Sequence, residues 1–367
     1  MQHSTRATCV LLVLLLGAVR AWAQPAAPSR PTRSGADVYR AACAACHGAD
    51  GKGAPVFTDV DVPDFTDCSF SSPEPAPDWA AIVRRGGPVR AFSRRMPSFE
   101  DALTDDEIDE VVEYVQNLCT DRKWPRGDLN LPRPLVTEKA FPENETVIAT
   151  SVSASRPTSV GNELIYEQRI GRRTQYEVVI PFNLQEQGGG SWTRGLGDVA
   201  VALKHALFAH LPAGTIGSLG AEAKLPTGKE SSGLGGGTTV LEGFGIVSQM
   251  LPRDGFLHLQ AGAEFPLEGD DPDEAFLRMA AGKTFAYRGW GRAWSPMLEV
   301  IAVQALVGGA KREWDLVPQM QVSLSTRQHI LFNAGVQIPV GDPSRRDTTF
   351  HMYVLWDWFD GGLFTGW

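Results

Sequence analysis

After its first 23 residues the sequence has no apolar run long enough to cross a membrane as a helix, which takes about 20 residues. Basic residues are in the minority, because 34 Lys and Arg stand against 43 Asp and Glu and leave a net charge of −9. Nucleic acids bind basic surfaces, so this balance argues against a nucleic acid partner. Apart from one Cys-x-x-Cys-His motif, the sequence shows no metal cluster and no acid–base pair that would supply the chemistry of an enzyme.

The first 23 residues have the organisation of a Sec-type signal peptide. Arg6 precedes an apolar run from Cys9 to Val19, and Ala21-Trp22-Ala23 is the small-x-small pattern that signal peptidase cleaves. The apolar run is too short for a retained anchor to be the favoured interpretation. We expect residues 1–23 to be removed on export and residues 24–33, rich in Pro, Ala and Ser, to form a disordered leader.

The remaining chain divides into three segments, and its length of 367 residues already favours more than one structural unit. Residues 34–122 have a mainly helical pattern. Residues 123–146 contain four prolines that break any regular period, and we interpret them as a linker or docking segment. The pattern of residues 147–367 predicts β-strands.

The strand region contains about twelve stretches in which apolar and polar residues alternate. In 257–265 every odd-numbered residue is apolar, and 332–340 repeats the pattern. A soluble sandwich would turn the apolar faces inward, whereas a membrane barrel turns them outward to lipid and has a polar lumen. The even number of stretches, the Gly-rich loop at 233–237 and the aromatic cluster at 356–359 favour the barrel. We predict an antiparallel transmembrane β-barrel of about 12 strands, with a soluble β-domain as the alternative.

Four polar residues of these stretches are predicted to face the lumen of the barrel: Lys204, His205, His258 and Glu264. They form an ion path in one interpretation and simply solvate the lumen in the other.

The most specific motif is Cys43-Ala44-Ala45-Cys46-His47. In this C-x-x-C-H spacing two thiols can add to the two vinyl groups of one porphyrin, and the histidine supplies an axial ligand to the iron. A redox dithiol does not need the histidine, and a structural zinc site needs a second ligand pair. We therefore predict one covalently attached haem c, bound through Cys43, Cys46 and His47.

The second axial ligand follows by elimination, because a low-spin electron-transfer haem needs a sixth ligand. Between Ser34 and Trp124 the only histidine is His47 and the only methionine is Met96. Pro97 stiffens the backbone beside Met96. Methionine raises the reduction potential relative to a second histidine. The alternative is a core methionine beneath a five-coordinate haem.

Two further cysteines, Cys68 and Cys119, remain after export. An oxidising compartment permits a disulfide between them, and two independent buried thiols are the alternative.

Around the haem ligands the chain resembles the class I cytochrome c family over about 90 residues. The segments that carry the resemblance are Tyr39 ahead of Cys43, 47–53 after the second cysteine, 62–67, 86–88, and Met96-Pro97-Ser98-Phe99 followed by 103–108. The resemblance implies an all-α domain whose last helix packs on the helix before Cys43. Thr104 with Glu107 predicts a capping box at the start of that last helix.

Five arginines precede Met96: Arg84, Arg85, Arg90, Arg94 and Arg95. This basic cluster could contact haem propionates or steer an acidic partner, and the plainer interpretation is solvated surface.

The strand region resembles the outer-membrane proteins first associated with phenol-degradation operons, on the segments 176–182, 195–204 and 220–228. The overall plan is similar to that of the fused cytochrome-porins of iron-oxidising bacteria, from which this chain departs by its full-size cytochrome domain and smaller barrel.

These features predict an outer-membrane monohaem protein that passes electrons between the periplasm and an external donor or acceptor, such as a metal ion. Its partners would be redox proteins or that external species, together with outer-membrane lipid, and the cytochrome domain would lie in the periplasm or the barrel mouth. In the alternative, the barrel is only an anchor or a solute pore. An electron carrier is favoured over an enzyme, which would be an outer-sphere metal oxidase.

Overall fold

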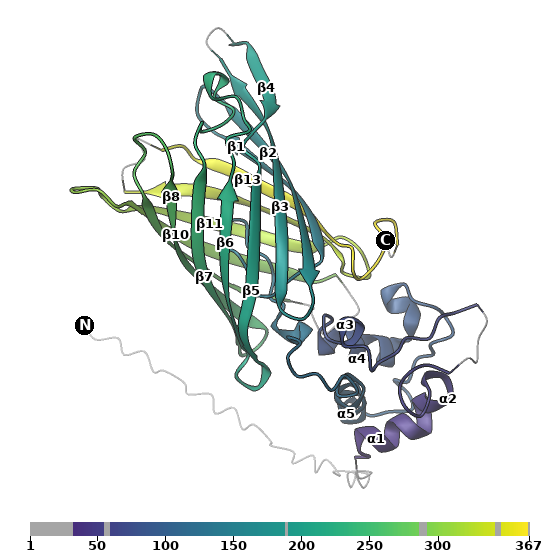
Figure 1. Ribbon diagram of the computed structural model, residues 1–367. Coiled ribbons are helices and arrows are strands. Elements are labelled where there is room, and N and C mark those ends of the chain that lie inside the picture. The colour runs from purple at the N-terminus through teal and green to yellow at the C-terminus, as the bar shows by residue number, and fades with distance from the viewer. Residues whose placement is uncertain (1–31, 55–58, 188–189, 286–291, 342–345, 366–367) are drawn as a thin grey trace, which may run out of the picture. The chain divides into compact units, whose positions relative to one another are not determined.

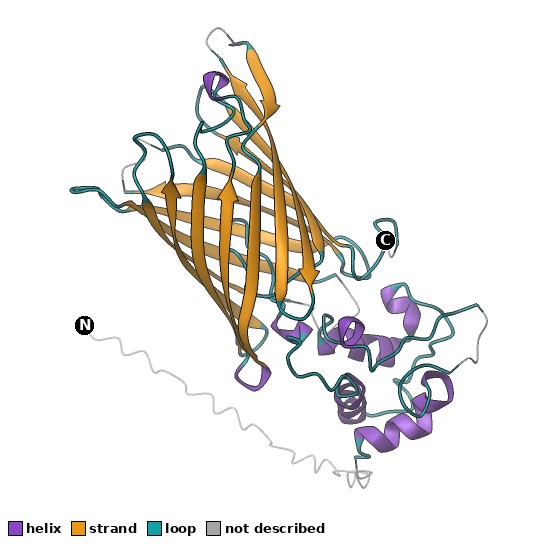
Figure 2. Cartoon of the chain, in the orientation of Figure 1, coloured by secondary structure: helices purple, strands orange, loops and turns teal. Residues whose placement is uncertain are grey.

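The structure is a computed structural model that describes residues 32–54, 59–187, 190–285, 292–341 and 346–365. The predicted signal peptide and nearly all of the predicted leader lie outside these residues. Residues Arg33–Trp367 form one compact unit. Within the described residues every α-helix precedes residue 145 and every strand follows residue 144. Figure 2 shows the strands gathered in the barrel, whose connections include the 3₁₀ turns Leu211–Ala213 and Glu230–Ser232.

The helical part consists of short elements. They are α1 Gly35–Val38, the π-helical turn Tyr39–Cys43, α2 Ala44–His47, α3 Cys68–Ser71, α4 Ala76–Arg85, the 3₁₀ turn Gly87–Arg90, α5 Asp105–Gln116 and the 3₁₀ turn Gly127–Leu129. Among the described residues no helix has the length and apolar character needed to cross a membrane.

Helix α5 organises the core of this part. Its predicted capping box is present, because the Thr104 hydroxyl accepts from the Glu107 amide and the Glu107 carboxylate accepts from the Thr104 amide. Its apolar face is buried with residues of α1 and α4 in one cluster: Val38, Tyr39, Phe65, Ala80, Leu103, Ile108, Val111, Val112 and Val115. The helix before Cys43 packs closely on α5, since a Cβ at Gly35 would lie 2.1 Å from the Glu110 carbonyl oxygen. The packing implied by the cytochrome resemblance is therefore observed.

The strand part is a closed barrel of twelve antiparallel strands (Figure 1). The strands are β1 Glu145–Ser153, β2 Ser159–Ile170, β3 Thr174–Glu186, β5 Ala200–His210, β6 Thr215–Lys224, β7 Val240–Leu251, β8 Gly255–Pro266, β9 Glu274–Lys283, β10 Trp294–Ala305, β11 Glu313–Ser323, β12 Ile330–Val340 and β13 Thr349–Asp357. Each pairs with its sequence neighbour, and β1 pairs with β13 from Glu145↔Asp357 to Ser153↔Thr349 to close the ring. Short strand β4, Trp192–Leu196, extends β3 beyond β5. Closure pairs each of the twelve barrel strands on both sides, as a bilayer requires, whereas the short β4 is paired only with β3 among the described residues.

The barrel has its apolar residues outside and its polar residues inside. In β11 the side chains of Asp315, Gln319 and Gln321 are buried, whereas those of Leu316 and Met320 are exposed. Strand β8 has the same order, with His258 and Gln260 fully buried and apolar Leu259 exposed. A soluble sandwich would show the reverse. The barrel prediction is therefore confirmed, and the soluble β-domain is excluded.

The two ends of the barrel differ in the length of their connections. At one end the strands are joined by 171–173, 211–214, 252–254, 284–293 and 324–329, and at the other by 154–158, 187–199, 225–239, 267–273, 306–312 and 341–348, so all but one of the connections at the first end are six residues or shorter. Short turns at one end and longer loops at the other are typical of bacterial outer-membrane barrels, whose short turns are periplasmic. Tyr166 stacks on Trp358 with ring centroids 6.0 Å apart near the short-turn end, where an aromatic girdle is expected.

Candidate functional site

The cysteines of the C-x-x-C-H motif lie in two successive helical turns. Cys43 ends the π-helical turn, and Cys46 and His47 lie in α2. The π-helical turn adds one residue to the hydrogen-bonded ring and occurs frequently at functional sites. Both thiols are free and half-buried, so they are available for covalent attachment.

The backbone around His47 is fixed by local hydrogen bonds. The Tyr39 hydroxyl donates to the Gly48 carbonyl at 2.8 Å, and the Gly53 amide donates to the His47 carbonyl at 2.9 Å. The imidazole stacks on Phe65 with centroids 4.7 Å apart. Burial lowers the pKa of His47 and so favours the neutral imidazole, which is the form that binds iron.

Two buried nitrogens of this region have no hydrogen-bond partner among the described residues, His47 Nδ1 and Trp79 Nε1. Leaving such groups unpaired is costly, so each calls for an explanation. Both residues contact Phe65, which lies 4.7 Å from the His47 ring and 5.6 Å from the Trp79 ring. A neutral imidazole and an unused indole donor on one aromatic cluster, together with the free thiols of Cys43 and Cys46, fit a covalently bound haem.

Met96 lies in a loop that returns to the end of α4. The Gly87 amide donates to the Met96 carbonyl at 3.0 Å, and Gly86 has a φ of +83°, which favours glycine. A Cβ at Gly87 would lie 2.3 Å from the Ser93 carbonyl oxygen, so the loop needs glycine there as well. Helix α4 carries Trp79 near its start and this loop at its end, and thereby connects the surroundings of the two predicted ligands. The assignment of Met96 as a ligand stays a prediction.

Cys68 and Cys119 form a disulfide, which decides between the two alternatives left by the sequence. The bridge ties the start of α3 to the residues that follow α5.

The arginine cluster before Met96 is largely neutralised by carboxylates within the same part of the chain. The ion pairs are Arg84–Asp105, Arg85–Glu100, Arg90–Asp78 and Arg95–Asp59. The Arg90–Asp78 pair is buried, whereas the other three are at least partly exposed and contribute little to stability. All four pairs reduce the electrostatic field that would attract an acidic partner.

The segment predicted as a linker enters the barrel. Residues 129–143, called the lumen segment from here on, contain side chains that are almost fully buried: Leu129, Leu131, Arg133, Thr137, Lys139, Ala140, Phe141 and Glu143. Ahead of it, the Asp128 carboxylate accepts from the Ala76 amide, and the Gly127 amide donates to the Ser72 carbonyl. The same stretch of chain is thus bonded to the helical part at one end and to the barrel at the other.

The lumen segment has no regular secondary structure beyond its first residue, and the barrel wall supplies its hydrogen-bond partners. The Glu299 carboxylate accepts from the backbone amides of Leu135 at 2.9 Å and Thr137 at 2.7 Å. On the carbonyl side, the hydroxyl of Tyr353 donates to Arg133 at 2.6 Å. Other wall residues that bond its backbone are Gln175, Lys204, Ser218, Ser248, His258, Gln260, Gln319, Gln321 and Asn333. Inward polar side chains that a water-filled pore would solvate are here bonded to protein.

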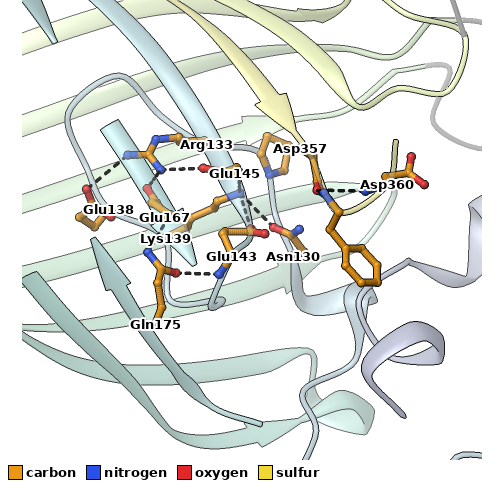
Figure 3. Close-up of polar contacts among 12 residues, drawn as sticks. Asn130, Arg133, Glu138, Lys139, Glu143, Glu145, Glu167, Gln175, Asp357 and Asp360 are labelled. Carbon is orange, nitrogen blue, oxygen red and sulfur yellow. Dashed lines mark hydrogen bonds and ion pairs between the residues drawn. The ribbon is translucent and has the colours of Figure 1, made fainter. Parts of the chain in front are cut away.

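Two cations of the lumen segment are held by buried carboxylates, as Figure 3 shows. The Arg133 guanidinium pairs with Glu145 at 2.7 Å and also with Glu167, and these two carboxylates are 1% and 0% exposed. Lys139 Nζ lies 2.5 Å from Glu143 and 3.3 Å from Glu145. Buried charges persist only when paired in this way.

The residues assigned to the lumen from the sequence are not all in it. Lys204 and His258 face inward, where both bond the lumen segment. His205 was placed wrongly: it follows Lys204 in the same strand, so it points to the outer face, where it is exposed and bonds Thr174. An ion path through both neighbours is therefore excluded.

A cavity of about 160 Å³ lies between the lumen segment and the wall. Its lining includes four carboxylates and two cations: Glu138, Glu177, Glu222, Glu242, Lys204 and Arg278. The excess of carboxylates favours cations over anions there. Among the described residues no group of three or more His, Cys, Asp or Glu side chains is arranged to hold a metal ion.

The helical part is similar to one known protein family. Residues 30–115 match the model of the family described as cytochrome c oxidase, cbb3-type, subunit III. No curated protein matches the chain.

The solved structures similar to the chain include an outer membrane channel and two porins. An outer membrane channel from Pseudomonas putida F1 has a TM-score of 0.45 at 10% identity, covering 61% of this chain and 98% of its own. The NanC porin gives 0.40 at 10% identity, with coverages of 57% and 98%. The KdgM porin in complex with disordered oligogalacturonate gives 0.38 at 9% identity, with coverages of 58% and 98%.

Replacing Arg133 by alanine tests the contribution of the lumen segment to stability. The change leaves Glu145 and Glu167 buried without their main cation, so we expect a loss of about 3–5 kcal/mol. The temperature at which the folded barrel converts to the unfolded band on a gel should fall clearly below that of the unmodified protein. The matched control is Arg312→Ala, which removes an exposed arginine that bonds Gln304 and lies over the Trp314 ring. Equal conversion temperatures for both variants would show that the Arg133 pairs do not stabilise the barrel.

Proposed function

We propose that this protein is a monohaem electron-transfer protein of the outer membrane that exchanges electrons between the periplasm and an external donor or acceptor, such as a metal ion. The observation that carries the proposal is the continuous bonded chain from the C-x-x-C-H domain into the barrel lumen. The family match over residues 30–115 supports a cytochrome function for the helical part.

The residues that would hold the haem are Cys43 and Cys46 by thioether bonds, with His47 and Met96 as axial ligands. When bound, the haem supplies a one-electron iron couple. Tyr39 fixes the backbone at His47, and burial keeps that imidazole neutral. The Trp79 indole N–H is available to donate to an acceptor on the haem. We further propose that this domain is a class I cytochrome c and that the barrel is related to the phenol-operon outer-membrane proteins.

The lumen segment argues against the solute-pore alternative. Its backbone is bonded to inward side chains around the wall, so a solute would have to break several buried hydrogen bonds to pass. The same contacts are also expected for a barrel that serves only as an anchor, so the anchor and the conduit are distinguished by the liposome experiment below.

The distance across the membrane sets the requirement for conduction. The apolar band of a bacterial barrel is about 25 Å tall, more than one haem spans unaided. An external ion or carrier would therefore have to approach from the long-loop side. The carboxylate-rich cavity beside Glu138 would favour a cation in that role.

Met96→Ala tests the axial ligand. The variant should bind external ligands such as imidazole at the haem iron and should have a lower reduction potential, because the thioether no longer stabilises the reduced state. The visible spectrum and a redox titration measure both effects, with Met250→Ala in the barrel as control. An unchanged spectrum would show that Met96 is not a ligand.

Reconstitution into liposomes separates conduction from anchoring. Vesicles that hold a reductant and face an impermeant ferric chelate should reduce the chelate only when the haem-loaded protein is present. The control is Cys43→Ala with Cys46→Ala, which keeps the barrel but has no haem attachment. If the haem becomes reduced while the chelate does not, the barrel is an anchor and the conduit proposal fails.

A further inference from the structure

A single arginine of the barrel reaches the loop that carries Met96. Arg327 lies in the short turn between β11 and β12. Its Nε donates to the Arg90 carbonyl at 2.9 Å and its Nη2 to the Ala91 carbonyl at 3.3 Å. Its guanidinium carbon also lies 4.1 Å from the centroid of the Phe92 ring. Three successive residues of the helical part are therefore held by one side chain of the barrel.

The barrel turn that carries Arg327 is itself fixed. The His329 ring donates from Nε2 to the Gly362 carbonyl at 3.1 Å, so its Nδ1 accepts from the Ser325 hydroxyl at 3.0 Å. The Ser325 and His329 side chains are almost completely buried. The third arm of the guanidinium, Nη1, donates to the Asp360 carbonyl at 2.7 Å. A Cβ at Gly361 would lie 2.4 Å from that Nη1, so a larger residue there would displace the guanidinium from this position.

The loop that Arg327 holds is short and closed. The Phe92 amide donates to the Gly87 carbonyl at 2.9 Å, the Met96 amide to the Ser93 carbonyl at 3.2 Å, and the Gly87 amide to the Met96 carbonyl at 3.0 Å. Ala91 has a φ of +55°, a left-handed conformation that is unfavourable for alanine, and its carbonyl is one of the two that Arg327 binds. Because these hydrogen bonds connect residues 87–96 in a closed loop, a displacement of residues 90–92 also displaces Met96.

We propose that Arg327 is a positioning residue for the distal haem ligand, so that the barrel turn sets how firmly Met96 is held at the iron. This inference rests on the proposed function, since it needs Met96 to be the second ligand. Arg327 acts through the carbonyls of the loop and does not contact the ligand itself. The barrel thereby tunes the redox centre as well as carrying it.

The test compares full-length, haem-loaded variants in detergent. In Arg327→Ala the affinity of the ferric haem for imidazole should rise roughly tenfold, because charge-assisted hydrogen bonds no longer hold the loop. The reduction potential should fall, and the far-red absorption band of a methionine-ligated ferric haem should weaken. Arg327→Lys keeps the charge but not the three-armed geometry and should give an intermediate imidazole affinity. It also decides the matter if the alanine variant does not fold.

Arg172→Ala is the matched control. Arg172 lies in the β2–β3 turn at the same end of the barrel and pairs at 2.5 Å with Asp121, which is not part of the Met96 loop. Its imidazole affinity and potential should equal those of the unmodified protein. If imidazole affinity and reduction potential change equally in the Arg172 and Arg327 variants, the effect comes from a general weakening of the structure and the inference is overturned. An Arg327→Ala variant with unchanged imidazole affinity would also overturn it. The assignment of Met96 as a ligand is tested separately: if that assignment is wrong, Met96→Ala leaves the haem spectrum unchanged.

Discussion

The pairing of Arg133 with buried carboxylates of the barrel wall is the constraint on which the rest of the structure depends. A guanidinium that is 8% exposed is stable inside a barrel only because Glu145 and Glu167 are there to neutralise it. Conversely, these two carboxylates would be unstable in a lumen without that cation. The charges therefore fix the register of the lumen segment, and its backbone amides and carbonyls then meet their partners on the wall.

The lumen segment and Arg327 attach the helical part of the chain to the barrel. The segment that fills the lumen is bonded to α4 through Asp128 and to the barrel through Glu299, so the cytochrome part cannot leave the barrel without breaking buried contacts. Arg327 adds a second connection, at the loop of the proposed distal ligand. A barrel that served only to admit solutes would not need its interior bonded to protein.

Patterns that are local in the sequence predicted the structure well. Alternation in 257–265 gave a strand with its apolar face outward, and Thr104 with Glu107 gave the helix start. The lumen segment could not be predicted, because prolines at 132, 134 and 142 remove any period and its partners come from strands spread over the whole barrel. The two cations Arg133 and Lys139 in a proline-rich stretch were the one indication in the sequence that this segment needs buried carboxylate partners. His205 was misplaced because neighbours in a strand face opposite sides.

Ion conductance across a planar lipid bilayer tests most directly whether the lumen is closed by this segment. The comparison is between the unmodified protein and a variant in which residues 130–142 are replaced by a flexible Gly-Ser sequence of equal length. The account predicts that the unmodified protein conducts little and that the replacement opens a cation-preferring channel, since the wall carboxylates Glu177, Glu222 and Glu242 remain while Arg133 and Lys139 are removed. A large, steady conductance of the unmodified protein, equal to that of the variant, would contradict it.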